Sequence, residues 1–338
     1  QNNNDDDYDI RRASSRRPPP LSPARIEYDE LLRQSRDLLD KFSSHDNATT
    51  STTTTTLQLM DFDRVMTRLS RFHSTVDGAN GSTEGTDMSA STAYGGYPDT
   101  SLKAEASDLC TTLLRALEDN YDRNHAAVRT GGGDDTDNTS MHHHHHRARR
   151  LVPNAASYNL ALHALARSDK GGDVASEAVG VLTRMLDRCR RYRDAVNDDV
   201  RGDGDEVGRT TSSAMPPPPP SEPTIITYNS VLHAIARSGA DDAGHLAEGA
   251  YAEMERWREE CATHNGDREE CSDDERRRRR RGHRYRGVLP NARTLACVID
   301  AGAADSDAAG GKRSFAAERA QAVLDSAVEG RRAYVASR

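Results

Sequence analysis

Residues 153–168 read PNAASYNLALHALARS, and residues 223–238 read PTIITYNSVLHAIARS. Nine of the sixteen aligned positions are identical, so the chain contains an internal repeat. A weaker third copy begins at Pro290 and reads PNARTLACVIDAGAAD. Self-similarity of this kind is typical of proteins in which one short structural unit recurs along the chain.

Each copy predicts a helix that begins a few residues after a proline. Proline disfavours helix in the residue before it, and Ser or Thr side chains accept hydrogen bonds from the first free N–H groups of a helix. Ser157, Thr227 and Thr294 are therefore the predicted N-caps. One face of each helix is expected to be buried: Tyr158, Leu162, Leu165 and Ala166 in the first copy, and Tyr228, Leu232, Ile235 and Ala236 in the second.

A second, alanine-rich helix follows each copy after a short break. The three segments read ASEAVGVLTRML, LAEGAYAEMERW and AAERAQAVLDSA. One such hairpin cannot cover its own apolar faces, so we expect the hairpins to stack as an α-solenoid. Nine segments of the chain carry a helical period and none shows the alternating pattern of a strand, so the predicted fold is all-α.

The two strong copies resemble the pentatricopeptide repeat family. The signature of that family is Pro-Asp or Pro-Asn, two variable residues, Thr/Ser-Tyr-Asn, and then two helices. It is matched here by Pro153-Asn154 with Ser157-Tyr158-Asn159, and by Pro223-Thr224 with Thr227-Tyr228-Asn229. The third copy departs from the signature, because Leu295 and Ala296 stand where Tyr and Asn are expected.

This resemblance implies that each repeat reads one base of a single-stranded RNA. Asn159 and Asn229 would make the first contact with a base edge, Thr224 and Asn291 would make the second, and Ala156 and Ile226 would lie against base faces. The pair Asn229 and Asn291 resembles combinations that favour a pyrimidine, whereas Ala296 predicts that the third repeat reads nothing. The family further implies organellar RNA processing, stability or translation, in a mitochondrion or chloroplast, with another RNA-processing protein as a partner.

Composition divides the chain into helical and low-complexity segments, and the latter lack the apolar area that offsets ordering entropy. The predicted organisation is a disordered segment at 1–25; a helical region at 26–120 that holds a degenerate repeat, with a second helix at 102–120, and is interrupted by disordered 43–56 and 77–101; a disordered linker at 121–150; repeat 1 at 151–190; a disordered insertion at 193–222; repeat 2 at 223–261; a charged disordered insertion at 262–287; and a divergent repeat 3 at 288–330. Because residue 1 is Gln1 and not Met, we expect the natural start to lie upstream.

Composition and motifs together argue against an enzyme. Of the 338 residues, 35% are hydrophobic, and 46 basic residues face 54 acidic ones. The mean hydropathy is -0.84, so one large core is not expected. The sequence contains no Gly-rich phosphate loop, serine nucleophile elbow or His-Glu-x-x-His motif. We therefore predict no enzymatic activity, no cofactor and no small-molecule substrate. No apolar run approaches the ~18 residues of a membrane span, so no membrane partner is predicted.

Three further features leave alternatives open. His142–His146 has metal-binding atoms in a homopolymer tract, and the spacing of Cys261, His264, Cys271 and His283 matches no compact zinc site, so no metal is predicted. The run Arg276–Arg281 either neutralises RNA phosphates or is a solvated insertion. Two rival functions remain beside RNA reading: a helical scaffold that binds a protein without contacting RNA, and a short array that docks onto another RNA-binding protein.

Overall fold

The computed structural model describes residues 23–45, 59–80, 100–130, 152–168, 170–201, 219–266, 288–308 and 313–336. Every secondary-structure element within these ranges is an α-helix, which confirms the predicted all-α class. The helices are α2 (Pro23–His45), α3 (Leu59–Asn80), α4 (Thr100–Thr130), α6 (Ala155–Arg167), α7 (Asp173–Arg201), α8 (Ile225–Ser238), α9 (Ala243–Gly266), α11 (Ala292–Ala308) and α12 (Arg313–Ala336).

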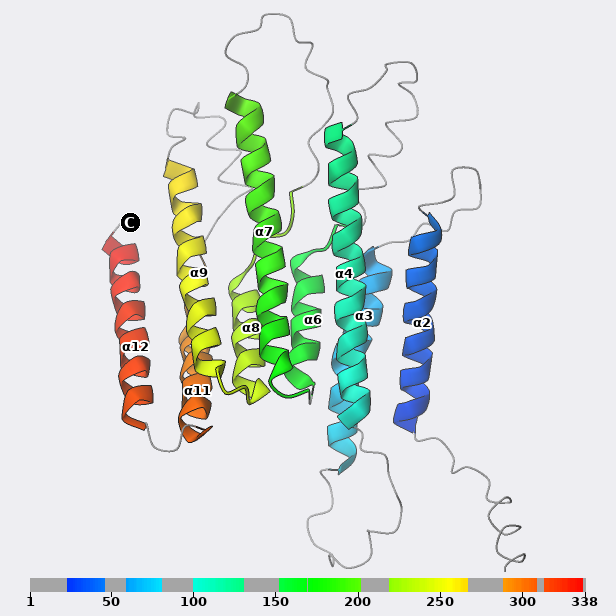
Figure 1. The fold of residues 1–338 in the computed structure, drawn as a ribbon, viewed down its shortest axis with the longest axis horizontal. Coiled ribbons are helices and arrows are strands. Elements are labelled where there is room, and N and C mark those ends of the chain that lie inside the picture. Colours follow the sequence, from blue (N-terminus) through cyan, green and yellow to red (C-terminus); the bar gives the residue numbers. More distant parts are fainter. Residues whose placement is uncertain are drawn as a thin grey trace, which may run out of the picture.

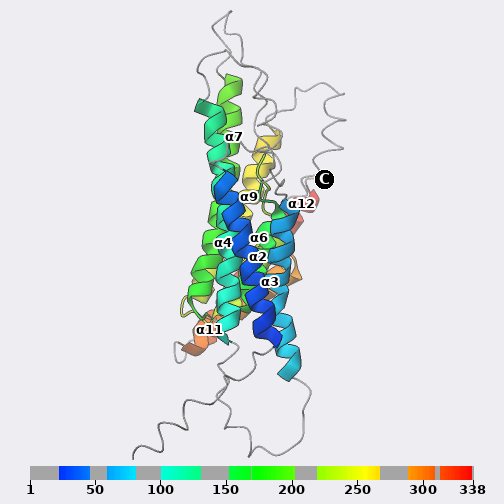
Figure 2. The same cartoon turned by 90° about the vertical axis from the view of Figure 1, so that its right-hand side faces the viewer.

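The helices stand side by side in two rows, and their order across the molecule follows the chain (Figure 1). In the first row α3 packs on α6, α6 on α8, and α8 on α11. The second row holds α4, α7, α9 and α12, each of which packs on the first-row helix that precedes it in the chain. Helices α4, α7 and α9 also pack on the next first-row helix. Figure 2 shows α2 at one end of the stack, against α3 and α4.

The predicted apolar faces lie in the core between these rows. Tyr158 and Tyr228 are 2% and 0% exposed, and the leucines and Ile235 expected beside them are buried as well. Ala236 is half-buried, because it packs at the edge of the core. Small residues on the second-row helices, such as Ala178 and Ala247, are fully buried and allow close packing.

The predicted N-caps are wrong by one helical turn. The caps of α6 and α8 are Asn154 and Thr224, whose side-chain oxygens accept from the backbone N–H groups of Ser157 and Thr227. Thr227 in turn accepts from the Thr224 N–H, which completes a capping box. The helices therefore begin two residues after the proline, since Asn and Thr cap as well as the Ser or Thr that follows them at the third helical position.

Several segments predicted to be disordered are shorter than expected, because the helices beside them extend further. Helix α4 runs to Thr130 and α7 to Arg201, so 121–130 and 193–201 are helical. The reason is tertiary: Tyr121 is 6% exposed in the core, and the Arg193 guanidinium lies 4.0 Å from the ring centre of Trp257. The described ranges also take in 23–25, 43–45, 77–80, 100–101, 219–222 and 262–266, and the rest of the predicted disordered segments lies outside them.

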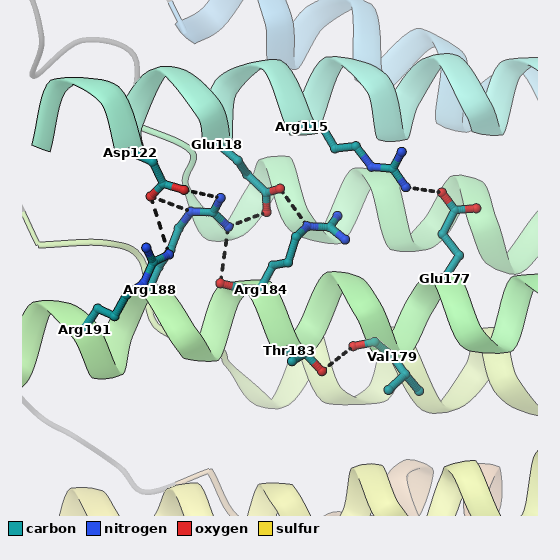
Figure 3. A network of polar contacts seen from close by, with 9 residues as sticks. All are labelled: Arg115, Glu118, Asp122, Glu177, Val179, Thr183, Arg184, Arg188 and Arg191. Carbon is teal, nitrogen blue, oxygen red and sulfur yellow. Dashed lines mark hydrogen bonds and ion pairs between the residues drawn. The ribbon is translucent and has the colours of Figure 1, made fainter. Parts of the chain in front are cut away.

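Buried charges join neighbouring helices of the second row (Figure 3). The Glu118 side chain on α4 is 1% exposed, and its Oε2 accepts a 2.8 Å hydrogen bond from Arg184 Nε on α7. Arg188, which is 6% exposed, places Nη1 2.9 Å from Glu118 Oε1 and donates through Nη2 to Asp122 at 2.8 Å. Burial raises the pKa of Tyr158 on α6, and a hydrogen bond with Glu118 raises it further. The Glu118 carboxylate of α4 therefore interacts with α7 in the second row and with α6 in the first.

We predict that Arg188→Ala lowers the free energy of unfolding by about 3–5 kcal/mol, because it leaves the Glu118 charge buried with one partner fewer. Arg115→Ala serves as the control, since Arg115 is 55% exposed and pairs with Glu177 at 3.4 Å. That variant should cost less than about 1 kcal/mol. Urea unfolding followed by circular dichroism measures both, and equal losses would contradict the role given to Glu118.

Candidate functional site

Polar residues recur at equivalent positions wherever one first-row helix meets the next. We call each such set of residues a junction. It consists of the residue that follows the buried aromatic on one helix, the residue that caps the next helix, and the third residue of that next helix. The three junctions are α3–α6 (Asp63, Asn154, Ser157), α6–α8 (Asn159, Thr224, Thr227) and α8–α11 (Asn229, Asn291, Thr294).

At the α8–α11 junction the three side chains form a closed set of hydrogen bonds. Thr294 Oγ1 donates to Asn229 Oδ1 at 2.6 Å, and Asn229 Nδ2 donates to Asn291 Oδ1 at 3.5 Å. Asn291 Oδ1 also accepts from the Thr294 backbone N–H at 3.0 Å. Asn229 is only 9% exposed, whereas Asn291 is exposed. The predicted pair is therefore brought together, but Asn229 is largely occupied by its neighbours.

The α3–α6 junction has the same layout with a carboxylate in place of the amide. Ser157 Oγ donates to Asp63 Oδ1 at 2.7 Å, and Asn154 Nδ2 donates to Asp63 Oδ2 at 3.3 Å. Asn154 Oδ1 accepts from the Ser157 N–H at 2.9 Å. Asp63 was not among the site residues predicted from the sequence.

The α6–α8 junction is the least satisfied of the three. The two threonine hydroxyls lie 3.1 Å apart and bond to each other. Among the described residues, no partner reaches the buried Oδ1 of Asn159. A buried polar atom without a partner costs free energy, so this junction is less stable than one whose side chains are all hydrogen-bonded. The predicted residues Asn159 and Thr224 thus lie on adjacent helices without a hydrogen bond between them.

The outer surface of the first row carries apolar side chains at the positions predicted to face bases. Ile226 is 57% exposed and Ala156 is exposed. Met60, which aligns with them on α3, is 66% exposed. On α11 the aligned residue is the exposed Arg293, and Ala296 presents no polar group to a ligand. An exposed apolar side chain therefore lies in the first turn of three successive first-row helices, α3, α6 and α8.

Arginines form a second series along the same row. Arg71, Arg167 and Arg237 each follow the buried aromatic by nine residues, and all three are exposed. Arg167 Nη1 donates to the Ser70 carbonyl at 3.1 Å, so it reaches the middle of the neighbouring helix α3. Two of these arginines lie in the last helical turn, where they also favour the helix dipole.

Two histidines of the first row lie close to these arginines. Burial lowers the pKa of His163, and Arg167 and Arg293 lower it further. Burial also lowers the pKa of His233, with Arg237, Arg293, His163 and Arg167 acting in the same direction. No acidic group is among these causes. Arg293 thus disfavours the protonated form of both His163 on α6 and His233 on α8.

Sequence reasoning missed Asp63 and the arginine series, although a signal for both was present. The segment Met60-Asp61-Phe62-Asp63 aligns with Ala156-Ser157-Tyr158-Asn159, and Arg71 then aligns with Arg167. Phe62 is fully buried, as Tyr158 is. The second helix predicted at 102–120 is part of α4, which packs on α3.

Neither a protein-family model, nor a curated protein, nor a solved structure matches this chain. Within the described ranges, no helix has both the length and the apolar character needed to cross a membrane. Among the same residues, no group of three or more His, Cys, Asp or Glu side chains could hold a metal ion. His142–His146, Cys271, Arg276–Arg281 and His283 lie outside the described residues.

We predict that Thr294→Val lowers the free energy of unfolding by about 1–3 kcal/mol, because it removes the hydroxyl that donates to the buried Asn229 Oδ1. Thr183→Val is the matched control, since that exposed threonine bonds only to the Val179 carbonyl of its own helix, as Figure 3 shows. The control should change stability by less than about 0.5 kcal/mol. Chemical denaturation of the two variants decides whether the junction hydrogen bond stabilises the fold.

Proposed function

We propose that the two rows of helices are an α-solenoid of pentatricopeptide-type repeats that binds single-stranded RNA along its first-row surface. The observation that carries the proposal is the register of three features on successive helices. Each of α3, α6 and α8 presents an exposed apolar residue, a junction carboxylate or amide, and an exposed arginine, in the same order. A polymer with a regular repeat is the ligand that matches a regularly repeated surface.

The three features suit the three parts of a nucleotide. An unpaired base offers a flat apolar face, which Ile226 or Met60 can contact. Its edge carries hydrogen-bond donors and acceptors, and an amide side chain such as that of Asn159 has one NH₂ donor group and one carbonyl acceptor to match them. The phosphate is an anion, and the arginine series provides the cations. The net charge of -8 does not oppose this, because a ligand meets the local charge of a surface.

The proposed cellular role rests on the family resemblance alone. It comprises organellar RNA processing, stability or translation in a mitochondrion or chloroplast, together with a second RNA-processing protein. The rival, a scaffold that binds a protein, is favoured by the same exposed Ile226 and Met60, since exposed apolar side chains also serve peptide binding. The experiments below separate RNA from protein as the ligand.

We predict that Asn159→Ala weakens binding of a single-stranded RNA about three- to tenfold, the equivalent of one hydrogen bond. Its Oδ1 has no partner among the described residues, so thermal stability should stay unchanged or rise slightly. Asn229→Ala should differ from Asn159→Ala, because it removes the oxygen to which Thr294 donates. It should therefore lower stability as well as affinity. Fluorescence anisotropy with pyrimidine-rich oligonucleotides measures affinity. If filter binding retains no RNA at about 50 mM salt, the RNA proposal fails and the scaffold gains.

We further predict that Arg237→Gln reduces the slope of log affinity against log salt by about 0.7, the contribution of one phosphate contact on a single strand. Arg256→Gln removes the same charge from α9 in the second row, where the arginine pairs with Glu253 at 2.6 Å. That control should leave the slope unchanged. A uniform change in both variants would indicate that net charge, and not the first-row surface, attracts the RNA.

A further inference from the structure

We infer that the α3–α6 junction is an additional nucleotide site and that its Asp63 selects guanine. The inference rests on the proposed RNA binding and deepens it, because it assigns a base to a site that the sequence repeat does not mark. The site is formed by Met60 and Asp63 of α3 with Asn154 at the start of α6.

The equivalence of this site to the other junctions is geometric. Asp63 receives hydrogen bonds from the cap and from the third residue of the next helix, as the α8–α11 junction pairs Asn229 with Asn291 and Thr294. Met60 lies three residues before Asp63 and is 66% exposed, while Ile226 lies three residues before Asn229 and is 57% exposed. The side chains for a base face and a base edge therefore stand at the same spacing on both helices.

The chemistry of the α3–α6 junction nevertheless differs from that of the other two. A carboxylate only accepts hydrogen bonds, and its two oxygens offer about four acceptor sites. Asn154 and Ser157 use one site on each oxygen. Among the described residues, no arginine or lysine is paired with Asp63, and its side chain is half-buried. Each oxygen thus keeps capacity for one more donor.

Guanine is the base whose pairing edge carries two adjacent donors, N1–H and the N2 amino group. Adenine and cytosine each place a single donor beside an acceptor on that edge, and uracil places one donor between two acceptors. A carboxylate therefore forms two parallel hydrogen bonds with guanine and meets a repelling lone pair on each of the others. Bidentate recognition of this kind discriminates between bases by about 5- to 100-fold.

The test uses the whole chain and uridine oligonucleotides that carry a single guanosine, adenosine or inosine at matched positions. Wild-type protein should prefer guanosine over adenosine about tenfold, and inosine, which lacks the N2 amino group, should lose most of that preference. Asp63→Asn should abolish the preference for guanosine. The variant is expected to fold, because the α8–α11 junction shows that an asparagine fits this layout with hydrogen bonds to its neighbours.

Asp61→Asn is the matched control, since it removes the same charge from the first turn of α3. Both substitutions should raise affinity for the adenosine strand slightly, because each removes one negative charge. Only Asp63→Asn should lower affinity for the guanosine strand and so abolish the ratio between guanosine and adenosine. If wild-type protein binds RNA without that preference, or if Asp63→Asn keeps it, the guanine site is wrong while RNA binding stands. If no strand is bound at all, the proposed function itself fails.

Discussion

The structure depends on one constraint: a hairpin of two amphipathic helices cannot bury its own apolar surface. Tyr158 and Tyr228 are buried on helices that each pack on their own second-row helix and on the second-row helix of the preceding pair. Every first-row helix therefore needs neighbours on both sides, and the chain satisfies this need by stacking pairs in sequence order. At one end of the stack, helix α2 packs against α3 and α4 and covers the side of this pair that faces away from α6.

Apolar packing alone would not specify which pair follows which, because the repeats are alike. The second row supplies that information through charge. Helix α7 directs Arg184 and Arg188 toward acidic residues of α4, and Arg190 toward Glu260 of α9 at 2.8 Å. A buried ion pair contributes modestly to net stability, because both charges lose their hydration. If a different helix packed in that place, however, the same charge would be buried without a partner, which costs much more. We interpret the pairs as selecting the order of the helices.

The arginines of the two rows also differ in their surroundings, which bears on the surface proposed to bind RNA. Several second-row arginines, such as Arg184, Arg188 and Arg190, pair with acidic residues of neighbouring helices. First-row arginines such as Arg167 and Arg237 stand on an exposed surface instead, and the lowered pKa values of His163 and His233 record their presence. The first row thus carries exposed arginines on α3, α6 and α8, on the same helices as the junction residues.

The sequence by itself determined the helical class and the buried faces of α6 and α8, because a period in apolar residues is a local property of the chain. It also indicated Asn159, Asn229 and the exposed Ile226, which the repeat places in register. Only the tertiary structure placed Asp63 in the same series. The alignment of Phe62-Asp63 with Tyr158-Asn159 is too short to show this by itself, whereas the hydrogen bonds from Asn154 and Ser157 to Asp63 match those around Asn229. The state of each junction was likewise a tertiary matter: a threonine cap closes on its own helix and leaves the Asn159 oxygen alone, whereas an asparagine cap can reach back to the preceding helix.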